Sequence, residues 1–180
     1  MTTGRFQLAS PNIQGLLGER GVVLNVSFYQ RRFDWQREQV EQLWDDLKDA
    51  ETENQSDYFL GSMVFVKKND NDYEVIDGQQ RLVTSTMIMA AIRNSLLVFV
   101  AVHGGDSRTI DEIDNLIMPR GFLSGSEASA RLVLGNQDRN DFRRYVQLRP
   151  GDVEHQSTTE GTRRNRIREA FSIVAEKVEE

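Results

Sequence analysis

The chain has 180 residues, enough for one ordinary domain with a small appendage, and 38% of them are hydrophobic and 28% charged. The formal net charge of −6 makes the surface as a whole repel a phosphate backbone, so contact with nucleic acid needs a local basic patch. Cysteine is absent, which excludes a thiol nucleophile, a disulfide framework and a thiolate metal site.

The first predicted elements are a short helix, a strand and an amphipathic helix. Ser10 and Pro11 suit the start of a helix that ends at Gly21, and the β-branched stretch 22–28 predicts a strand. Residues 36–50 predict the clearest amphipathic helix of the chain. Apolar residues recur there at i, i+3, i+4 and i+7 along one face, and acidic residues fill the other.

A β-hairpin is predicted next. The stretches 58–68 and 73–76 have strand character, and the polar residues 69–72 between them predict a turn. We expect the two strands to pair in antiparallel fashion. Asp77 directly follows the second strand of this hairpin.

The stretch after Asp77 predicts a long helix that begins at Gln79 or Gln80 and ends near His103. Its apolar residues wrap most of the way round, so protein is expected to cover both sides. The same stretch is the one candidate membrane span, and the charge of Arg93 within it favours a core helix instead. The N-terminus lacks the pattern of a signal peptide, so we expect a cytoplasmic protein without membrane contact.

The C-terminal part is predicted to be mainly helical, with a helix at 110–118, a strand at 131–135, a helix at 137–148 and an amphipathic helix within 162–180. This mixture of strands and helices predicts an α+β or α/β fold, of which we take α+β. We place one domain at residues 1–105 and a helical extension at residues 106–180. The last helical pattern runs to the final residue, so we expect the N-terminal piece of a longer protein.

The stretch Asp77-Gly78-Gln79-Gln80-Arg81 lies where the predicted hairpin passes into the long helix. Such a turn exposes the first N–H groups of the helix, which attract an anion together with the helix dipole. Gly78 lets a ligand approach the main chain, and Arg81 can bind a phosphate through two N–H groups. Gln79 and Gln80 can hold a ribose, a base edge or water, while Asp77 can ligate Mg²⁺ or orient an attacking water. These groups fit a nucleotide; the alternative is a capped, solvated first turn with a structural role only.

A second polar stretch, 28–35, interleaves aromatic and basic residues between a strand and a helix, where loops carry function. Arg31 or Arg32 can bind a phosphate here, and Tyr29, Phe33 or Trp35 can stack on a base. Of these residues and Gln30, we expect Tyr29, Gln30 and Arg31 to contact a ligand. The two remaining aromatic residues are expected to pack in the core beside the next helix: Phe33 and Trp35.

These stretches resemble a known family when they are taken in order and with their spacing. The segments YQRRFDW, QVEQLWDDL, YFLGSMVFV and EVIDGQQRLVT are similar to the N-terminal domain of GmrSD-type modification-dependent restriction enzymes, which phosphorothioate-sensing SspE proteins share. The likeness is close over residues 22–90 and looser beyond, and Val83 is a mild departure from the family pattern. The family's domain resembles the ParB and sulfiredoxin superfamily, which implies a mixed sheet with a buried helix after the Asp-Gly turn.

The resemblance implies a function as well as a fold. It implies Mg²⁺-dependent binding and hydrolysis of a nucleoside triphosphate, often GTP, in a bacterial defence protein that senses modified phage DNA and controls a C-terminal nuclease domain. The family signature falls on Asp77, Gln79, Gln80 and Arg81 as catalytic residues. The nucleotide-binding set comprises Tyr29, Gln30, Arg31, Gly78 and Arg81. A sulfiredoxin-like redox activity is excluded because it needs a cysteine beside this turn.

Two features bear on DNA. His103 and His155 lie in polar loops without ligand neighbours, so we expect no nuclease activity from this chain. Residues 137–168 hold eight arginines against five acidic residues, which can face DNA or another domain. The alternative is a helix surface crossed by ion pairs. The candidate DNA contacts are Arg139, Arg143, Arg144, Arg163 and Arg164.

Three hypotheses follow from these observations. The first is an NTPase sensor domain, and the second is a DNA-reading module in which the nucleotide is only a ligand or is absent. The third is a scaffold whose site has decayed and that serves assembly alone, with a homodimer as one option. A nucleotide that binds the native state must raise the thermal midpoint, which separates the third hypothesis from the first.

Overall fold

The computed structural model describes residues 12–19, 21–119, 130–152 and 165–180. The fold is α+β, as the sequence predicts. In chain order its elements are α1 (Ile13–Gly18), β1 (Val23–Asn25), α2 (Arg37–Thr52), β2 (Val64–Lys67), β3 (Asp72–Asp77), α3 (Gln79–His103), α4 (Arg108–Ile117), β4 (Leu132–Val133), α5 (Asn136–Phe142), the π-helix η1 (Arg143–Gln147) and α6 (Arg166–Glu179).

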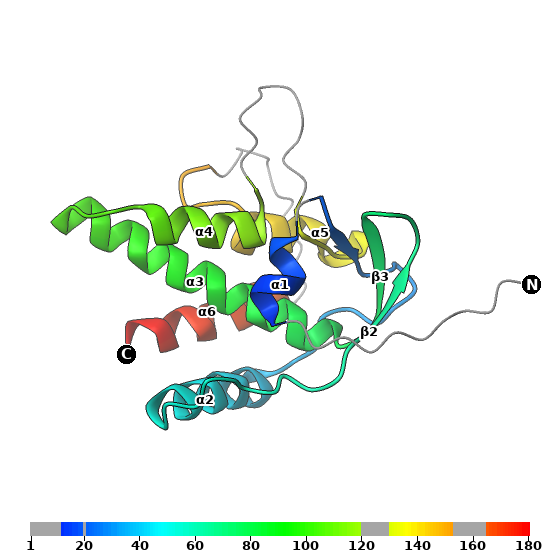
Figure 1. The fold of residues 1–180 in the computed structure, drawn as a ribbon, viewed down its shortest axis with the longest axis horizontal. Helices are drawn as coiled ribbons and strands as arrows, with labels where there is room; N and C mark the ends of the chain where they lie inside the picture. The colour runs from blue at the N-terminus through cyan, green and yellow to red at the C-terminus, as the bar shows by residue number, and fades with distance from the viewer. Residues whose placement is uncertain (1–11, 20, 120–129, 153–164) are drawn as a thin grey trace, which may run out of the picture.

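A mixed four-stranded sheet lies at the N-terminal end of α3 (Figure 1). The strand order is β2-β3-β1-β4, and β1 runs parallel to both of its neighbours, whereas β2 and β3 form the antiparallel hairpin that the sequence predicts. Leu24 of β1 is opposite Tyr73 of β3 on one side and Leu132 of β4 on the other. The sheet therefore includes a strand from the C-terminal part of the chain, while the division at residue 105 stays a prediction.

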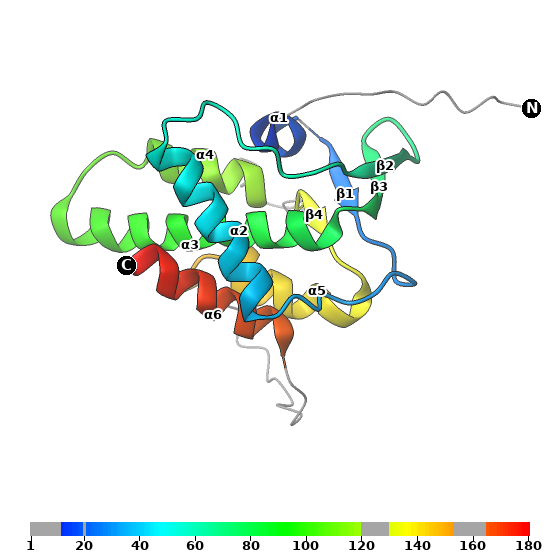
Figure 2. The same ribbon diagram turned by 90° about the horizontal axis from the view of Figure 1, so that it is seen from below.

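The central helix of the molecule is α3, with α4, α6 and η1 in contact along its length (Figure 2). Its bounds agree with the prediction, and most of its residues from Gln80 to Arg93 are buried. Leu82, Met87 and Ala90 are fully enclosed. A helix covered on several sides needs apolar residues around its whole circumference, which is the pattern seen in the sequence.

By length and composition α3 is also the one helix among the described residues that could cross a membrane. The core helices of soluble proteins meet the same criterion. Its C-terminal end exposes three apolar side chains, whereas its N-terminal half is enclosed by protein. The fully buried charge of Arg93 has protein partners, which supports the interpretation as a core helix.

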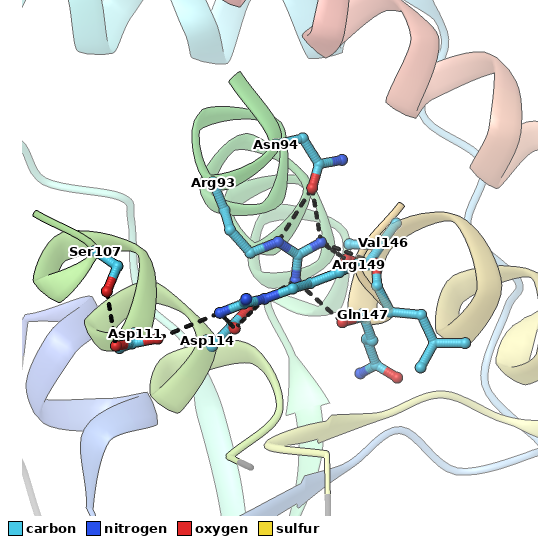
Figure 3. A network of polar contacts seen from close by, with 9 residues as sticks. Arg93, Asn94, Ser107, Asp111, Asp114, Val146, Gln147 and Arg149 are labelled. Atoms are coloured by element: carbon cyan, nitrogen blue, oxygen red, sulfur yellow. Dashed lines mark hydrogen bonds and ion pairs between the residues drawn. The ribbon is translucent and has the colours of Figure 1, made fainter. Parts of the chain in front are cut away.

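Arg93 lies at the junction of α3, α4 and η1 (Figure 3). Its guanidinium donates hydrogen bonds to the carbonyl oxygens of Val146 and Gln147 at 3.1 Å and of Leu148 at 3.0 Å, and it pairs with Asp114 at 3.2 Å. The last carbonyl groups of a helix lack helical partners, and the negative end of the helix dipole favours a cation. Arg93 therefore caps the end of the π-helix from inside the core.

Several predicted elements differ from those observed. The strand expected at 131–135 forms only as β4, and the helix expected at 137–148 continues from α5 into the π-helix η1. The strand expected at 58–68 forms only as β2, because its partner β3 ends opposite Val64 and leaves 58–63 without a strand to pair with. The strand expected at 22–28 ends at Asn25, and a turn follows in which the amide of Gln30 donates to the carbonyl of Ser27. The first helix has its N-cap at Asn12, whose side chain accepts from an amide of the first turn. The predicted cap positions 10 and 11 lie outside the described residues.

Candidate functional site

The turn between β3 and α3 requires glycine. Gly78 has φ +92°, in the left-handed region that other residues adopt only with strain. A Cβ atom at this position would also lie 2.5 Å from Cγ of Met63. No side chain caps the start of α3, so its first N–H groups are left without helical or side-chain acceptors.

The two glutamines of the first turn of α3 hold the neighbouring loop. Gln80 is buried; its Nε2 donates to the carbonyl of Arg32 at 3.1 Å and its Oε1 accepts from the amide of Asp34 at 3.0 Å. Nε2 of Gln79 donates to the carbonyl of Arg31 at 3.1 Å. The two sequence stretches predicted to form a site are thus brought together. Both the nitrogen and the oxygen of the Gln80 side-chain amide form hydrogen bonds that join them.

Arg81 fastens a second loop to α3. Its Nη1 donates to the carbonyl of Leu60 and its Nη2 to the carbonyl of Ser62, both at 2.7 Å, and Nη2 is 3.6 Å from the carboxylate of Asp77. Gly61 has φ +84°, and a Cβ there would lie 2.0 Å from Nη1, so the guanidinium occupies the space that glycine leaves. Arg81 therefore positions the segment before β2 in addition to facing the site.

A buried carboxylate, which the sequence analysis missed, supports the loop that carries Tyr29. Glu74 of β3 accepts hydrogen bonds from the hydroxyls of Ser27 and Tyr29 and pairs with Lys68. These three donors, Lys68 first, lower the pKa of Glu74 from 4.5 to about 2. The ring of Tyr29 stays exposed, in edge-to-face contact with Phe28 at 5.6 Å between centroids.

Gln30 ties the same loop to β3 and leaves one oxygen without a partner. Its Nε2 donates to the carbonyls of Val75 at 2.6 Å and Ile76 at 3.5 Å. Since a carbonyl accepts only from the amide nitrogen, this contact fixes which atom is the oxygen, and the same reasoning holds for Gln79. The Oε1 atoms of Gln30 and Gln79 are both buried, and neither has a hydrogen-bond partner among the described residues.

Two adjoining cavities lie on this part of the surface. Cavity B, of about 320 Å³, lies against the start of α3 and is lined by Gln30, Arg31, Trp35, Asp77, Gly78 and Arg81, among others. Cavity A, of about 220 Å³, lies on the side of β4 and is lined by Val26, Phe28, Phe33, Val83, Leu134 and Gly135, among others. Both cavities share four residues: Gln30, Arg31, Gln79 and Gln80.

Arg31 and Asp77 are the accessible charged groups of cavity B. Arg31 is exposed, and its guanidinium has no partner among the residues that the structure describes. The side chain of Asp77 is 69% exposed, and its one polar contact among the described residues is the distant one with Arg81. A cation and the uncapped N-terminus of α3 thus lie on one cavity, an arrangement that attracts an anion.

A metal ion would find few ligands here. Within the described parts of the chain no group of three or more carboxylate or histidine side chains is arranged to hold a metal, so Asp77 is a single carboxylate. His103 ends α3, exposed beside Phe99 at 4.8 Å between ring centroids, and His155 lies outside the described residues.

The predicted basic surface is described in part. Arg139 of α5 and Arg143 and Arg144 of η1 have no acidic partner among the described residues, and Arg144 stacks over Tyr145 at 5.6 Å. Asp138, the residue before Arg139, forms an ion pair with Arg32. The predicted contacts Arg163 and Arg164 lie outside the described residues.

The aromatic residues Phe33 and Trp35 pack as predicted, Phe33 in the core and Trp35 partly buried against it. Two contributors to the site had no recognised signal in the sequence, Glu74 and the segment around Gly135. The alternation in β3 places Tyr73 and Val75 on one face and Glu74 on the other, so it gave no signal that Glu74 is buried. The second depends on the pairing of β4 with β1, which is a long-range contact.

The comparisons with known proteins give one match. Among models of protein families, the model described as GmrSD restriction endonuclease, N-terminal domain, matches residues 13–178. No curated protein matches the chain.

Proposed function

The chain belongs to the family of GmrSD restriction endonuclease N-terminal domains, and from this premise we propose that it binds and hydrolyses a nucleoside triphosphate, with GTP favoured. In the full-length protein, this activity acts as a sensor for modified phage DNA and regulates a nuclease domain elsewhere in the chain. The observation that carries the proposal is that Arg31, whose guanidinium has no partner among the described residues, lines cavity B together with the uncapped first turn of α3.

Phosphate binding follows from the charges and donors of cavity B. The triphosphate oxygens lie against the free N–H groups of α3 beyond Gly78, where the helix dipole favours negative charge. Arg31 supplies two N–H groups in a planar fork, and it has no ion pair to break among the described residues. Binding therefore uses groups that the folded chain leaves unsatisfied.

The four residues of the motif divide between contact and support. Gln80 and Arg81 position the loops at 31–34 and 60–62 through main-chain hydrogen bonds, so they act on the nucleotide mainly through those loops. Asp77, exposed at the edge of cavity B, orients the attacking water. Gln79 lines cavity B and holds the main chain at Arg31 through its amide nitrogen.

Mg²⁺ fits this site as an ion held mainly by the nucleotide. Mg²⁺ in phosphate-transfer sites keeps several waters and takes one or two carboxylates together with substrate phosphates. Asp77, which lines cavity B, would provide that carboxylate. When bound, the ion would neutralise charge on the phosphates as bonds are exchanged.

The test compares two arginine variants of the same site by thermal midpoint and phosphate release. Arg31→Ala should leave the midpoint without nucleotide unchanged and weaken nucleotide binding roughly tenfold to hundredfold, the value of a charge-assisted hydrogen bond. Arg81→Ala should lower the midpoint itself, because two carbonyl groups of the 60–62 segment lose their donor. Arg108→Ala, an exposed arginine outside both cavities, is the control. The proposal would be overturned if no nucleoside triphosphate gave either a midpoint shift or phosphate release.

A second candidate function is DNA binding, with the nucleotide as a ligand only. It is favoured by the three arginines of α5 and η1, which form no ion pair with an acidic residue among the described residues. In this function the domain contacts duplex DNA through Arg139, Arg143 and Arg144. A cytoplasmic bacterial location is part of both proposals.

A further inference from the structure

The loop that carries Arg31 is held by its main chain on the side of α3. Nε2 of Gln79 donates to the carbonyl of Arg31 at 3.1 Å. Gln80 donates to the carbonyl of Arg32 at 3.1 Å and accepts from the amide of Asp34 at 3.0 Å. These three contacts involve the main chain of the loop and not the side chains of its two adjacent arginines. They fix the path of the loop, but they do not decide which arginine is available to a ligand.

Asp138, in the first turn of α5, holds the same loop through both of its carboxylate oxygens. Oδ1 accepts from Nε of Arg32 at 2.8 Å and from Nη2 at 2.6 Å, and Oδ2 accepts from the amide of Phe33 at 2.8 Å. The residue is only 7% exposed, and it lines cavity A but not cavity B. Its carboxylate is thus committed to the loop through charge-assisted hydrogen bonds, which are the strong ones.

The two adjacent arginines differ in what they contact. Arg32 is bound by Asp138, whereas the exposed guanidinium of Arg31 has no partner among the described residues and lines both cavities. Adjacent residues share one main-chain path, so a contact that fixes Arg32 also restricts where Arg31 can reach. A buried carboxylate without a cation is costly, so Asp138 would draw in another guanidinium if Arg32 did not satisfy it.

We propose that Asp138 is a positioning residue of the phosphate site in cavity B: by binding Arg32 and the amide of Phe33, it keeps Arg31 free for the phosphates. The inference rests on the proposed function, since it takes Arg31 as the phosphate contact. Asp138 acts through the loop, because it does not itself line cavity B. Binding then costs less ordering, because the loop is already held in place before the ligand arrives.

The first experiment measures the dissociation constants of GTP and of inorganic tripolyphosphate for the 180-residue chain, at a temperature where each variant is folded. Asp138→Asn should weaken both ligands roughly tenfold, because the loop must then be ordered on binding. Asp141→Asn is the matched control and should bind as the wild type does. It makes the same chemical change on the same helix, at a side chain without a polar contact among the described residues. A lowered thermal midpoint with unchanged affinities in Asp138→Asn would mean that the residue serves stability alone, which contradicts the positioning role.

The second experiment asks whether Asp138 acts through Arg31. The double variant Arg31→Ala with Asp138→Asn should bind tripolyphosphate no more weakly than Arg31→Ala alone, because the contact that Asp138 protects is already lost. Additive losses would show that the two residues act independently, and the assignment would fall.

Arg32→Gln approaches the same contact from the loop, at a side chain that is 35% exposed and therefore easier to replace. It leaves the carboxylate of Asp138 without this ion pair and able to attract Arg31, so tripolyphosphate should again bind roughly tenfold more weakly. Unchanged binding in both Arg32→Gln and Asp138→Asn would overturn the positioning role while the proposed function stands. A wild type that binds neither GTP nor tripolyphosphate would overturn the proposed function and the positioning role together.

Discussion

At the scale of single residues, the polar side chains of this region bind main-chain groups more often than they bind each other. Gln30, Gln79, Gln80 and Arg81 each donate to at least one carbonyl of a neighbouring loop or strand. A carbonyl acceptor is present whatever the side chain of its residue, so these contacts constrain the loop path and leave loop side chains such as Arg31 free. Glu74 is the exception, because its carboxylate interacts with three side-chain donors.

The ionisation of Glu74 makes stability depend on acid pH. Its pKa is lowered to about 2 in the folded protein, so the stabilisation is complete above the ordinary value of 4.5 and is lost as the pH falls towards 2. Glu74→Gln should therefore lower the urea midpoint at neutral pH, and its difference from the wild type should shrink as the pH falls through that window.

The measurement is a series of urea unfolding curves at several pH values. Glu112→Gln, an exposed residue of α4 without a polar contact among the described residues, serves as the control and should follow the wild type throughout. A difference between Glu74→Gln and the wild type that stays constant across the acid range would show that the Glu74 carboxylate carries no pH-dependent stabilisation.

At the scale of elements, α3 connects the site to the rest of the protein. Its first turn holds the two loops beside the cavities, and fourteen residues further on Arg93 holds the end of η1. Arg93 and Arg149 both contact Asp114, so the acidic residue would keep one partner if the other were removed. The carbonyls of η1 would have no such replacement.

Replacing Arg93 is expected to be strongly destabilising. Arg93→Met should lower the free energy of unfolding by roughly 3–5 kcal/mol, the usual cost of removing one member of a buried ion pair. The free energy of unfolding of Arg93→Lys should lie between those of the wild type and of Arg93→Met. One ammonium group cannot reach all three carbonyls and the carboxylate that the planar guanidinium contacts. Chemical denaturation measures both.

Arg139→Met on the exposed face of α5 provides the matched control, and its effect should stay within about 0.5 kcal/mol. If Arg93→Met proved as stable as this control, the buried guanidinium would not be capping η1.

At the scale of the whole molecule, the charge distribution decides how a chain of net charge −6 could meet DNA. The acidic face of α2 repels phosphate, whereas α5 and η1 present arginines without acidic partners among the described residues. Any duplex contact should therefore be confined to the α5–η1 face. Its strength should fall with salt, since each neutralised phosphate releases counterions.

A salt titration of duplex binding tests this face. When the logarithm of the binding constant is plotted against the logarithm of the salt concentration, three phosphate contacts predict a slope of roughly −3. The combined substitution Arg139→Gln, Arg143→Gln and Arg144→Gln should remove most of the slope, and Arg108→Gln should keep it. The same slope in the triple variant and the wild type would exclude these arginines as the DNA contacts, on modified and unmodified duplexes alike.

The sequence by itself determined the α+β class, the antiparallel hairpin and the bounds of α3, because these depend on local periodicity and on Gly78 and Gly104 at the helix ends. It also singled out the stretches 29–31 and 77–81, since unusual polar residues at a strand-to-helix turn are visible without any tertiary contact. The structure brings these two stretches together, and their roles remain proposals.

Only the tertiary structure decided how the polar groups are used. Whether Arg81 faces a ligand or the carbonyls of Leu60 and Ser62 depends on where a loop folds back, and no local pattern encodes that. The burial of Glu74 and the pairing of β4 beside β1 likewise arise from contacts between segments far apart in the chain. Local propensity fixes which elements form, whereas the competition among distant partners for each donor and acceptor fixes which groups stay free to bind.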